Sequence, residues 1–204
     1  MKIIKLAIGS FQTNCYLVGD EETKAAFIID PAGDFEQIKN LIDTKKYDLK
    51  YIILTHGHGD HIGAVKALKE AYNSVLYIHE EDAEMLRDHQ LNLTYRMGEK
   101  IEMEADETFR DGDTLMLGNL ELKFIHTPGH SKGSSCVLVK DALFSGDTLF
   151  LNSIGRTDLY GGDRREIIES IKNKLLILPE ETKVYPGHGP GTSIKNELKK
   201  NPFF

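Results

Sequence analysis

Four short segments place histidine or aspartate beside glycine, and each follows directly on a short apolar run. The segments read THGHGDH (residues 55–61), TPGHS (127–131), SGDT (145–148) and YPGHGP (185–190). Loops at the ends of strands are where a rigid scaffold commonly presents reactive side chains. One such segment means little, but four together predict a constellation of polar side chains at the ends of strands.

The first segment lies between an expected buried strand and an expected helix, and its glycines let the backbone turn sharply. His56 and His58 are two positions apart in an extended stretch, so they can point the same way. Asp60 and His61 follow at the turn and can face a second point nearby. Imidazole nitrogen and carboxylate oxygen are ligands that zinc, manganese and iron accept. Solvated surface side chains are the alternative, but three histidines and one aspartate within six positions favour a metal site.

The pattern of apolar runs and turn residues predicts an α/β protein. Strands are expected at 3–8, 15–18, 25–29, 51–54, 75–78, 114–117, 120–126, 135–139, 142–144 and 184–185. Helices are expected at 35–44 with Asp34 as N-cap, at 62–72, 80–87 and 164–176, and after Thr192 or Ser193, either of which can cap a last helix. Residues 88–110 are expected to form loop and edge structure. Strands in runs, each followed by helices, favour two packed sheets with helices outside, in a single domain spanning 1–204.

Composition excludes several classes of partner. The net charge of −7 gives no broad attraction to nucleic acid or anionic lipid. No apolar run approaches the ~20 residues of a membrane span, and the N-terminus is more typical of a strand than of a signal peptide. Cys15 and Cys136 are expected to be buried thiols in strands. These features predict a cytoplasmic protein without nucleic-acid or membrane partners, and they leave its oligomeric state open.

The segments THGHGDH, TPGHSKGS, SGDTLF and YPGHGP resemble the signature motifs of the metallo-β-lactamase superfamily, and the resemblance covers residues 12–190. Their order and spacing are most similar to the glyoxalase II-like branch, whose members hydrolyse thioesters. The resemblance implies a four-layer αβ/βα sandwich with metal ions at one edge, between its halves. It assigns one metal to His56, His58 and His130, the second to Asp60, His61 and His188, and a bridging position to Asp147.

The implied activity is hydrolysis of a small anionic thioester such as S-lactoylglutathione. Two divalent ions are expected, zinc first, with iron and manganese as alternatives. Two metals that share a water lower its pKa from ~15.7 towards ~7, and the bridging hydroxide would attack the carbonyl carbon. Asp60 is expected to orient this nucleophile as well as bind metal. Arg156 and Tyr160, in a glycine-rich loop after Asp147, are expected to bind the substrate. Pairing with Asp158 or Asp163 is an equally weighted interpretation of Arg156.

Other classes remain to be separated from this one. The chain stops within 14 residues of Pro190, so the helical domain with which full-length glyoxalase II enzymes grip glutathione is expected to be absent, which leaves glutathione specificity open. The principal alternative is a mononuclear-iron persulfide dioxygenase-like oxidoreductase, because those enzymes share these motifs and a GRTD-like loop, here residues 155–158. The di-iron reductases of the superfamily are disfavoured because they carry Glu at the position of His58. A non-catalytic zinc module is disfavoured because a structural zinc site needs four ligands, whereas this chain offers seven.

Overall fold

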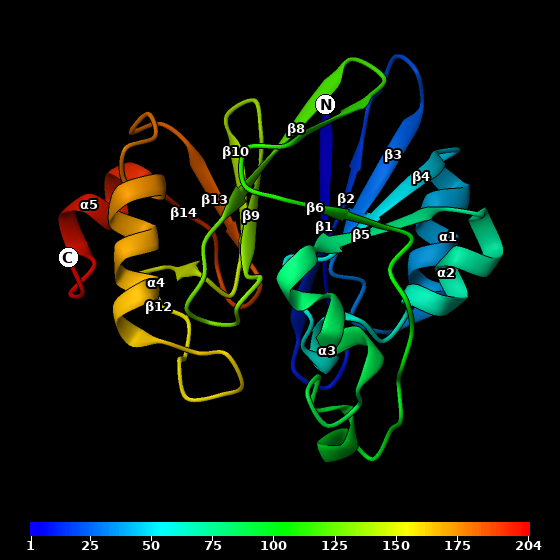
Figure 1. Ribbon diagram of the computed structural model, residues 1–204. Helices are drawn as coiled ribbons and strands as arrows, with labels where there is room; N and C mark the ends of the chain where they lie inside the picture. Colours follow the sequence, from blue (N-terminus) through cyan, green and yellow to red (C-terminus); the bar gives the residue numbers. More distant parts are fainter.

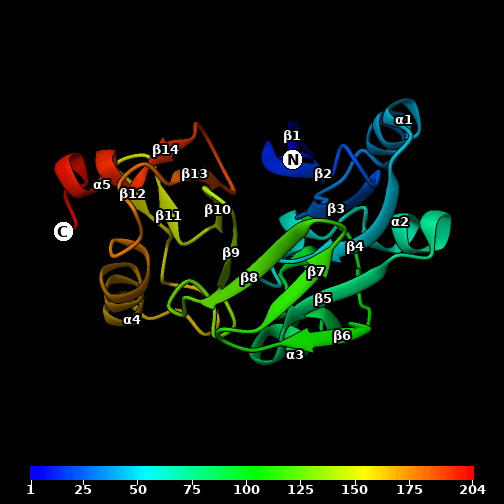
Figure 2. The same cartoon turned by 90° about the horizontal axis from the view of Figure 1, so that it is seen from above.

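The computed structural model describes residues 1–204 and contains two six-stranded β-sheets that face each other (Figures 1 and 2). The first sheet follows chain order: β1 (Lys2–Ile8), β2 (Thr13–Gly19), β3 (Ala25–Ile29), β4 (Asp48–Ile53), β5 (Val75–His79) and β6 (Glu107–Phe109). Its first three strands are antiparallel, and β3 to β6 run parallel. The carboxyl ends of the parallel strands therefore meet at one end of the sheet.

The second sheet comes from the remaining half of the chain. Its order is β14 (Thr192–Ser193), β13 (Lys183–Pro186), β10 (Ala142–Gly146), β9 (Ser135–Val139), β8 (Leu120–His126) and β7 (Thr114–Leu117). Only β10 and β13 are parallel neighbours. A small ribbon of β11 (Leu149–Phe150) and β12 (Ser153–Ile154) follows β10. Loops after β8, β10 and β13 lie at the same end of the molecule as the loop after β4.

Helices form the two outer layers. In Figures 1 and 2, α1 (Phe35–Lys45) and α2 (Val65–Tyr72) cover the first sheet, while α4 (Arg164–Ser170) and α5 (Ile194–Lys200) lie outside the second. A π-helical turn, Ile171–Leu175, continues α4, and α3 (Ala83–Arg87) lies near the lower end in Figure 1. The predicted four-layer αβ/βα sandwich is confirmed. None of the helices has the length and apolar character that crossing a membrane requires.

Three apolar clusters fill the three spaces between these layers. Ile52 of β4 packs in the cluster beneath α1 and α2, whereas its neighbour Ile53 packs between the sheets. Successive side chains of a strand point to opposite faces, so a strand buried on both faces needs a continuous apolar run. Ile167 and Ile171 fill the third space, between α4 and the second sheet. Each interlayer space thus has its own core, and the layers hold the strand ends in fixed positions.

Two local differences from the sequence prediction lie at helix starts. Asp34 does precede α1, but its backbone is left-handed (φ 50°) and its carboxylate accepts the Gly9 N–H at 3.2 Å instead of capping the helix. The helix predicted from residue 62 begins at Val65, because the Ala64 N–H donates to Pro31 O at 2.8 Å within a turn. Ser193 does cap α5 by accepting the Asn196 N–H.

Candidate metal centre

The loops that follow β4, β8, β10 and β13 converge at the lower end of the molecule in Figure 1, between the two sheets. The loop after β4 contains a single 3-10 turn, η1 (Gly59–His61). All seven side chains that the sequence analysis singled out as metal ligands come together here. They form overlapping groups whose nitrogen and oxygen atoms lie within 4.8 Å of one another: His56, His58 and His130; His56, His61 and Asp147; and Asp60, His61 and His188.

The first group consists of three buried imidazoles. His58 Nδ1 lies 3.0 Å from His130 Nε2, which in turn lies 3.3 Å from His56 Nε2. Burial holds the pKa of His56 well below its ordinary value, and burial together with the nearby His130 lowers the pKa of His58 to about 3. Both rings are therefore neutral near pH 7, which is the form of histidine that binds a metal.

The group made of Asp60, His61 and His188, called the second group from here on, is richer in negative charge. His188 Nε2 lies 3.4 Å from Asp60 Oδ2, and His61 Nε2 lies 3.8 Å from the same oxygen. Burial alone would lower the pKa of His61, but Asp60, Asp30 and Asp147 outweigh it and raise that pKa to about 10. Three carboxylates around one imidazole make this half of the site strongly attractive to a cation.

Asp147 lies between the two groups. One of its oxygens is 3.6 Å from His61 Nε2, and the other is 3.7 Å from His130 Nε2 and 3.5 Å from His188 Nε2. A single carboxylate thus faces nitrogen atoms of both groups. This is the placement expected of a ligand shared by two ions.

The donor atoms fit divalent metal ions. Buried His58 Nε2, His61 Nε2 and Asp147 Oδ1 have no hydrogen-bond partner, and leaving a buried polar atom unpaired costs about 1–3 kcal/mol. A cation between His61 and Asp147 would satisfy two of these atoms. Separations of 3.0–3.8 Å between the donors match the edge of about 3.4 Å that tetrahedral bonds of about 2.1 Å produce.

Asp30 supports the ligands from behind and was not identified from the sequence. Its carboxylate accepts the Thr55 N–H at 2.9 Å and the Thr55 hydroxyl at 2.7 Å, and it lies 3.0 Å from His61 Nδ1. Thr55 Oγ1 lies 3.1 Å from His56 Nδ1. Carboxylates of this kind fix the orientation of ligating imidazoles. The sequence signal was its position directly after an apolar run, before Pro31.

Asp82 joins the two ligand loops that the first imidazole group requires. Its fully buried carboxylate accepts the Gly57 N–H at 3.0 Å, the Ser131 hydroxyl at 2.6 Å and the Gly133 N–H at 2.6 Å. Burial raises the pKa of Asp82, and these three hydrogen bonds offset part of that effect. No local pattern in the sequence distinguishes this aspartate from its acidic neighbours, so only the folded chain reveals it.

The site opens into a cavity of about 560 Å³, which Arg156 lines. The guanidinium of Arg156 donates from Nε and Nη2 to Asp158, both at 2.7 Å, so the structure shows the pairing that the sequence left as an alternative. Its main-chain oxygen accepts from His130 Nδ1 at 2.8 Å. Arg156 therefore orients one of the candidate ligands through its backbone.

Tyr160, the other predicted substrate contact, does not line the cavity, although the preceding residue Leu159 does. Its hydroxyl donates to Glu84 Oε1 and accepts from Lys132 Nζ, each at 2.9 Å. The hydroxyl group that a substrate would use is thus already bonded to two surface side chains.

The three remaining histidines and both cysteines lie outside the centre. His79 and His126 stack on each other with ring centroids 3.9 Å apart. His89 Nδ1 lies 2.6 Å from Glu102 Oε1. Cys15 and Cys136 are free and buried in β2 and β9, as expected, so neither thiol reaches the cavity.

Comparison with known proteins places this geometry in a family. Residues 8–188 match the family described as the Metallo-beta-lactamase superfamily. The Haemophilus influenzae hydroxyacylglutathione hydrolase GloC is 35% identical, over all of this chain and 98% of that protein. The crystal structure of the BLEG-1 B3 metallo-beta-lactamase is 40% identical, with a TM-score of 0.94 over 99% of both chains. That of ETHE1 from Myxococcus xanthus is 32% identical, with a TM-score of 0.84 over 99% of this chain and 84% of the other.

Proposed function

We propose that this chain, which belongs to the metallo-beta-lactamase superfamily, is a metal-dependent hydrolase that cleaves a small thioester such as S-lactoylglutathione. The observation that carries the proposal is the pair of three-residue donor groups that share Asp147 and face one cavity. The similarity to a hydroxyacylglutathione hydrolase over the whole length of this chain supports a thioester as substrate.

His56, His58 and His130 would hold one divalent ion, and Asp60, His61 and His188 the second, with Asp147 shared. We expect zinc, and iron or manganese also suit this donor set. When bound, such ions supply Lewis acidity, which polarises a carbonyl oxygen and lowers the pKa of water.

The chain's own groups would place the reactants around these ions. Asp60 lines the cavity with a partly exposed carboxylate, which can accept a hydrogen bond from water and orient it towards the thioester carbonyl. The Arg156 main-chain oxygen holds the His130 ring in position. A covalent mechanism through cysteine would need a thiol in the cavity, and both thiols of this chain are buried in strands.

The proposal is tested by incubating the zinc-loaded protein with S-lactoylglutathione and measuring the thiol released with a chromogenic thiol reagent. We expect turnover that Asp147→Ala abolishes together with the binding of both metals, because this carboxylate faces both donor groups. Turnover of a chromogenic β-lactam is measured for comparison, and we expect it to be slower than turnover of the thioester. Failure to release thiol from any thioester, or an Asp147→Ala variant with two metals and normal turnover, would overturn the proposal.

One observation favours a second candidate, a one-iron oxidoreductase that acts on persulfides. Residues 155–158 read GRTD and resemble a loop of such enzymes. ETHE1 from Myxococcus xanthus is among the structural neighbours. Metal analysis combined with an oxygen electrode separates the two candidates. Iron near one per chain, with oxygen consumed in the presence of glutathione persulfide, would replace the hydrolase assignment.

A further inference from the structure

The cavity above the donor groups combines apolar walls with two arginines. Its apolar lining comes from several separate segments: Phe11, Leu93, Met97, Phe150 and Leu159. Arg96 and Arg156 are the two cationic side chains in this lining that no metal would use. A ligand that fills the cavity therefore meets apolar surface near the reaction centre and positive charge at two places.

The two arginines differ in how much of their charge the protein already compensates. Arg156 makes two hydrogen bonds to Asp158, both at 2.7 Å. Arg96 is exposed and forms no salt bridge, and its only side-chain hydrogen bond runs from Nε to the Tyr95 hydroxyl at 2.9 Å. Both terminal amino groups of the Arg96 guanidinium are thus left for a ligand, and a guanidinium binds a carboxylate through two parallel hydrogen bonds.

The segment that carries Arg96 is fastened directly to the metal-ligand loop. It forms the short 3-10 turn η3 (Thr94–Met97), in the part of the chain that lies lowest in Figure 1. The buried Asn92 accepts the Gly59 N–H on its main-chain oxygen at 2.6 Å. Its side chain accepts from the Thr94 N–H and hydroxyl, and donates to Ile101 O at 2.8 Å.

Gly59 makes this attachment close. A Cβ atom at Gly59 would lie 2.5 Å from Thr94 Cγ2 and 2.9 Å from Asn92 O, so only glycine lets the two segments approach. Because Gly59 immediately precedes Asp60, the turn that bears Arg96 keeps a fixed distance from the donor groups. An anion bound by Arg96 would therefore be held at a defined position relative to the reacting carbonyl.

We propose that Arg96 forms an anion-binding subsite at the mouth of the cavity. This subsite binds a carboxylate group of the substrate that is remote from the scissile thioester bond. This rests on the proposed thioester hydrolase function and narrows its substrates to thioesters that carry a remote carboxylate. The carboxylate can belong to the thiol half or to the acyl half of the substrate. Arg156, already paired with Asp158, contributes less to this recognition.

The binding test uses S-hexylglutathione, a thioether that cannot be hydrolysed, and its dimethyl ester, whose carboxylates are blocked. Dissociation constants are measured by titration calorimetry on the zinc-loaded protein. We expect Arg96→Gln to weaken binding of the free acid about three- to tenfold and to leave the diester unchanged, as the loss of one charged hydrogen-bond pair predicts. Arg96→Glu should weaken it further. Arg165→Gln is the matched control, since that arginine pairs with Glu169 on α4 outside the cavity.

Equal weakening of both ligands in Arg96→Gln, or a loss confined to Arg156→Gln, would overturn the subsite. A thioether that binds native protein and Arg96→Gln equally would exclude an anion on the thiol half of the substrate. Kinetics with S-lactoylglutathione and with the succinyl thioester of N-acetylcysteamine then locate the anion. KM rises in Arg96→Gln for the first if the thiol half is held, and for the second if the acyl half is held. Thioester turnover with unchanged KM for both would refute the subsite alone, whereas absent turnover would refute the function while the thioether still reports on Arg96.

Discussion

At the scale of single residues, Gly187 decides whether the second donor group can form. A Cβ atom there would lie 2.2 Å from Asp147 Oδ1 and 2.9 Å from His61 Cε1. Gly187→Ala should therefore displace the shared carboxylate and lower metal affinity by about 100-fold or more, with a parallel loss of activity. Metal content after dialysis, measured by mass spectrometry, checks this.

Gly189→Ala is the matched control, because a Cβ at that position meets nothing within 4 Å. Its backbone φ of 73° makes alanine cost about 1 kcal/mol of stability without touching a ligand. Metal retained in Gly187→Ala, or lost equally in both variants, would contradict the assignment of Asp147 as the shared ligand.

Asp82 is a second residue whose substitution should affect both stability and metal affinity. In Asp82→Asn, one amide oxygen remains as acceptor and the amide N–H group faces backbone donors, so at least one buried hydrogen bond is lost. We expect about 2 kcal/mol lower stability and a ten- to 100-fold lower metal affinity, since Gly57, Ser131 and Gly133 border the ligands. Chemical denaturation and metal titration measure the two effects. Glu80→Gln, which breaks only a surface pair with Arg110, should change neither.

At the scale of elements, the sequence predicted what depends on local pattern. The long strands that carry the ligands are apolar runs that end at glycine-flanked polar residues, so both their type and their ends were readable. The short strands β11 and β12 were not, because a two-residue ribbon leaves no periodicity. The roles of Asp82 and Arg96 also escaped, since they depend on contacts with segments distant in sequence.

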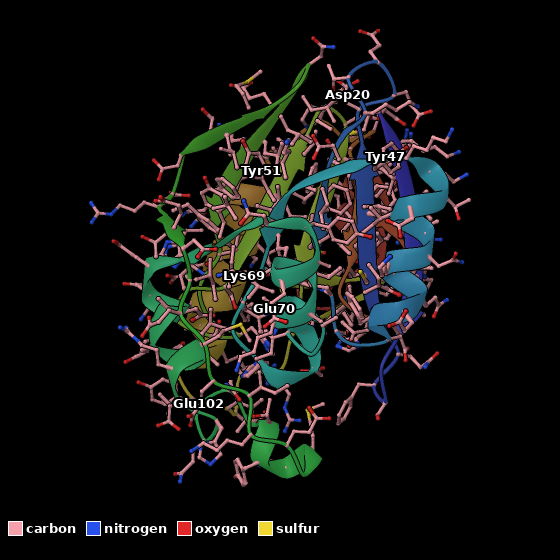
Figure 3. The ribbon with its side chains drawn as sticks, turned by 90° about the vertical axis from the view of Figure 1, so that its right-hand side faces the viewer. Asp20, Tyr47, Tyr51, Lys69, Glu70 and Glu102 are labelled. Atoms are coloured by element: carbon pink, nitrogen blue, oxygen red, sulfur yellow. The ribbon has the colours of Figure 1, made fainter.

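A hydrogen bond between turns at the end of the molecule opposite the metal centre also connects the two sheets. Asp20 follows β2 and accepts the Asn119 N–H, from the turn between β7 and β8, at 2.9 Å. Figure 3 shows Asp20 at the opposite end of the molecule from Glu102, which lies in the segment after α3. The backbone N–H groups of Asn119 and Glu22 lower the pKa of Asp20 to about 2. Its carboxylate therefore links the two sheets far from the metal centre.

Because the pKa of Asp20 is lowered in the folded protein, its stabilising effect is lost at low pH. The Asp20 contribution is fully present above its ordinary pKa of about 3.9 and is lost as pH falls through about 2. The denaturation midpoint of Asp20→Asn should thus lie below that of the native protein at pH 7, and the two should converge as pH approaches 2. Glu181→Gln, in an exposed turn, should follow the native protein throughout. A difference that stays constant on acidification would exclude this role.

At the scale of the whole molecule, each donor group draws on both halves of the sandwich. His56 and His58 follow the first sheet and His130 the second, while Asp60 and His61 follow the first and His188 the second. Every bound ion would therefore cross-link the two sheets at their lower edge. Apolar side chains fill most of the space between the sheets, and the Asp20–Asn119 hydrogen bond lies at the opposite end. Metal binding should therefore couple directly to the stability of the entire fold.

Removal of metal should for this reason lower the thermal midpoint of the whole chain in one transition. A ligand at 1,000 times its dissociation constant stabilises the folded state by about 4 kcal/mol, which corresponds to roughly 8–16 °C for a chain of this size. Scanning calorimetry of the zinc-loaded and chelator-treated protein measures the shift. His56→Ala and His188→Ala, which each impair a different donor group, should each lose part of it, and Asp147→Ala nearly all of it. A midpoint unaffected by chelation, or a separate early transition of one half, would show that the ions do not join the two sheets.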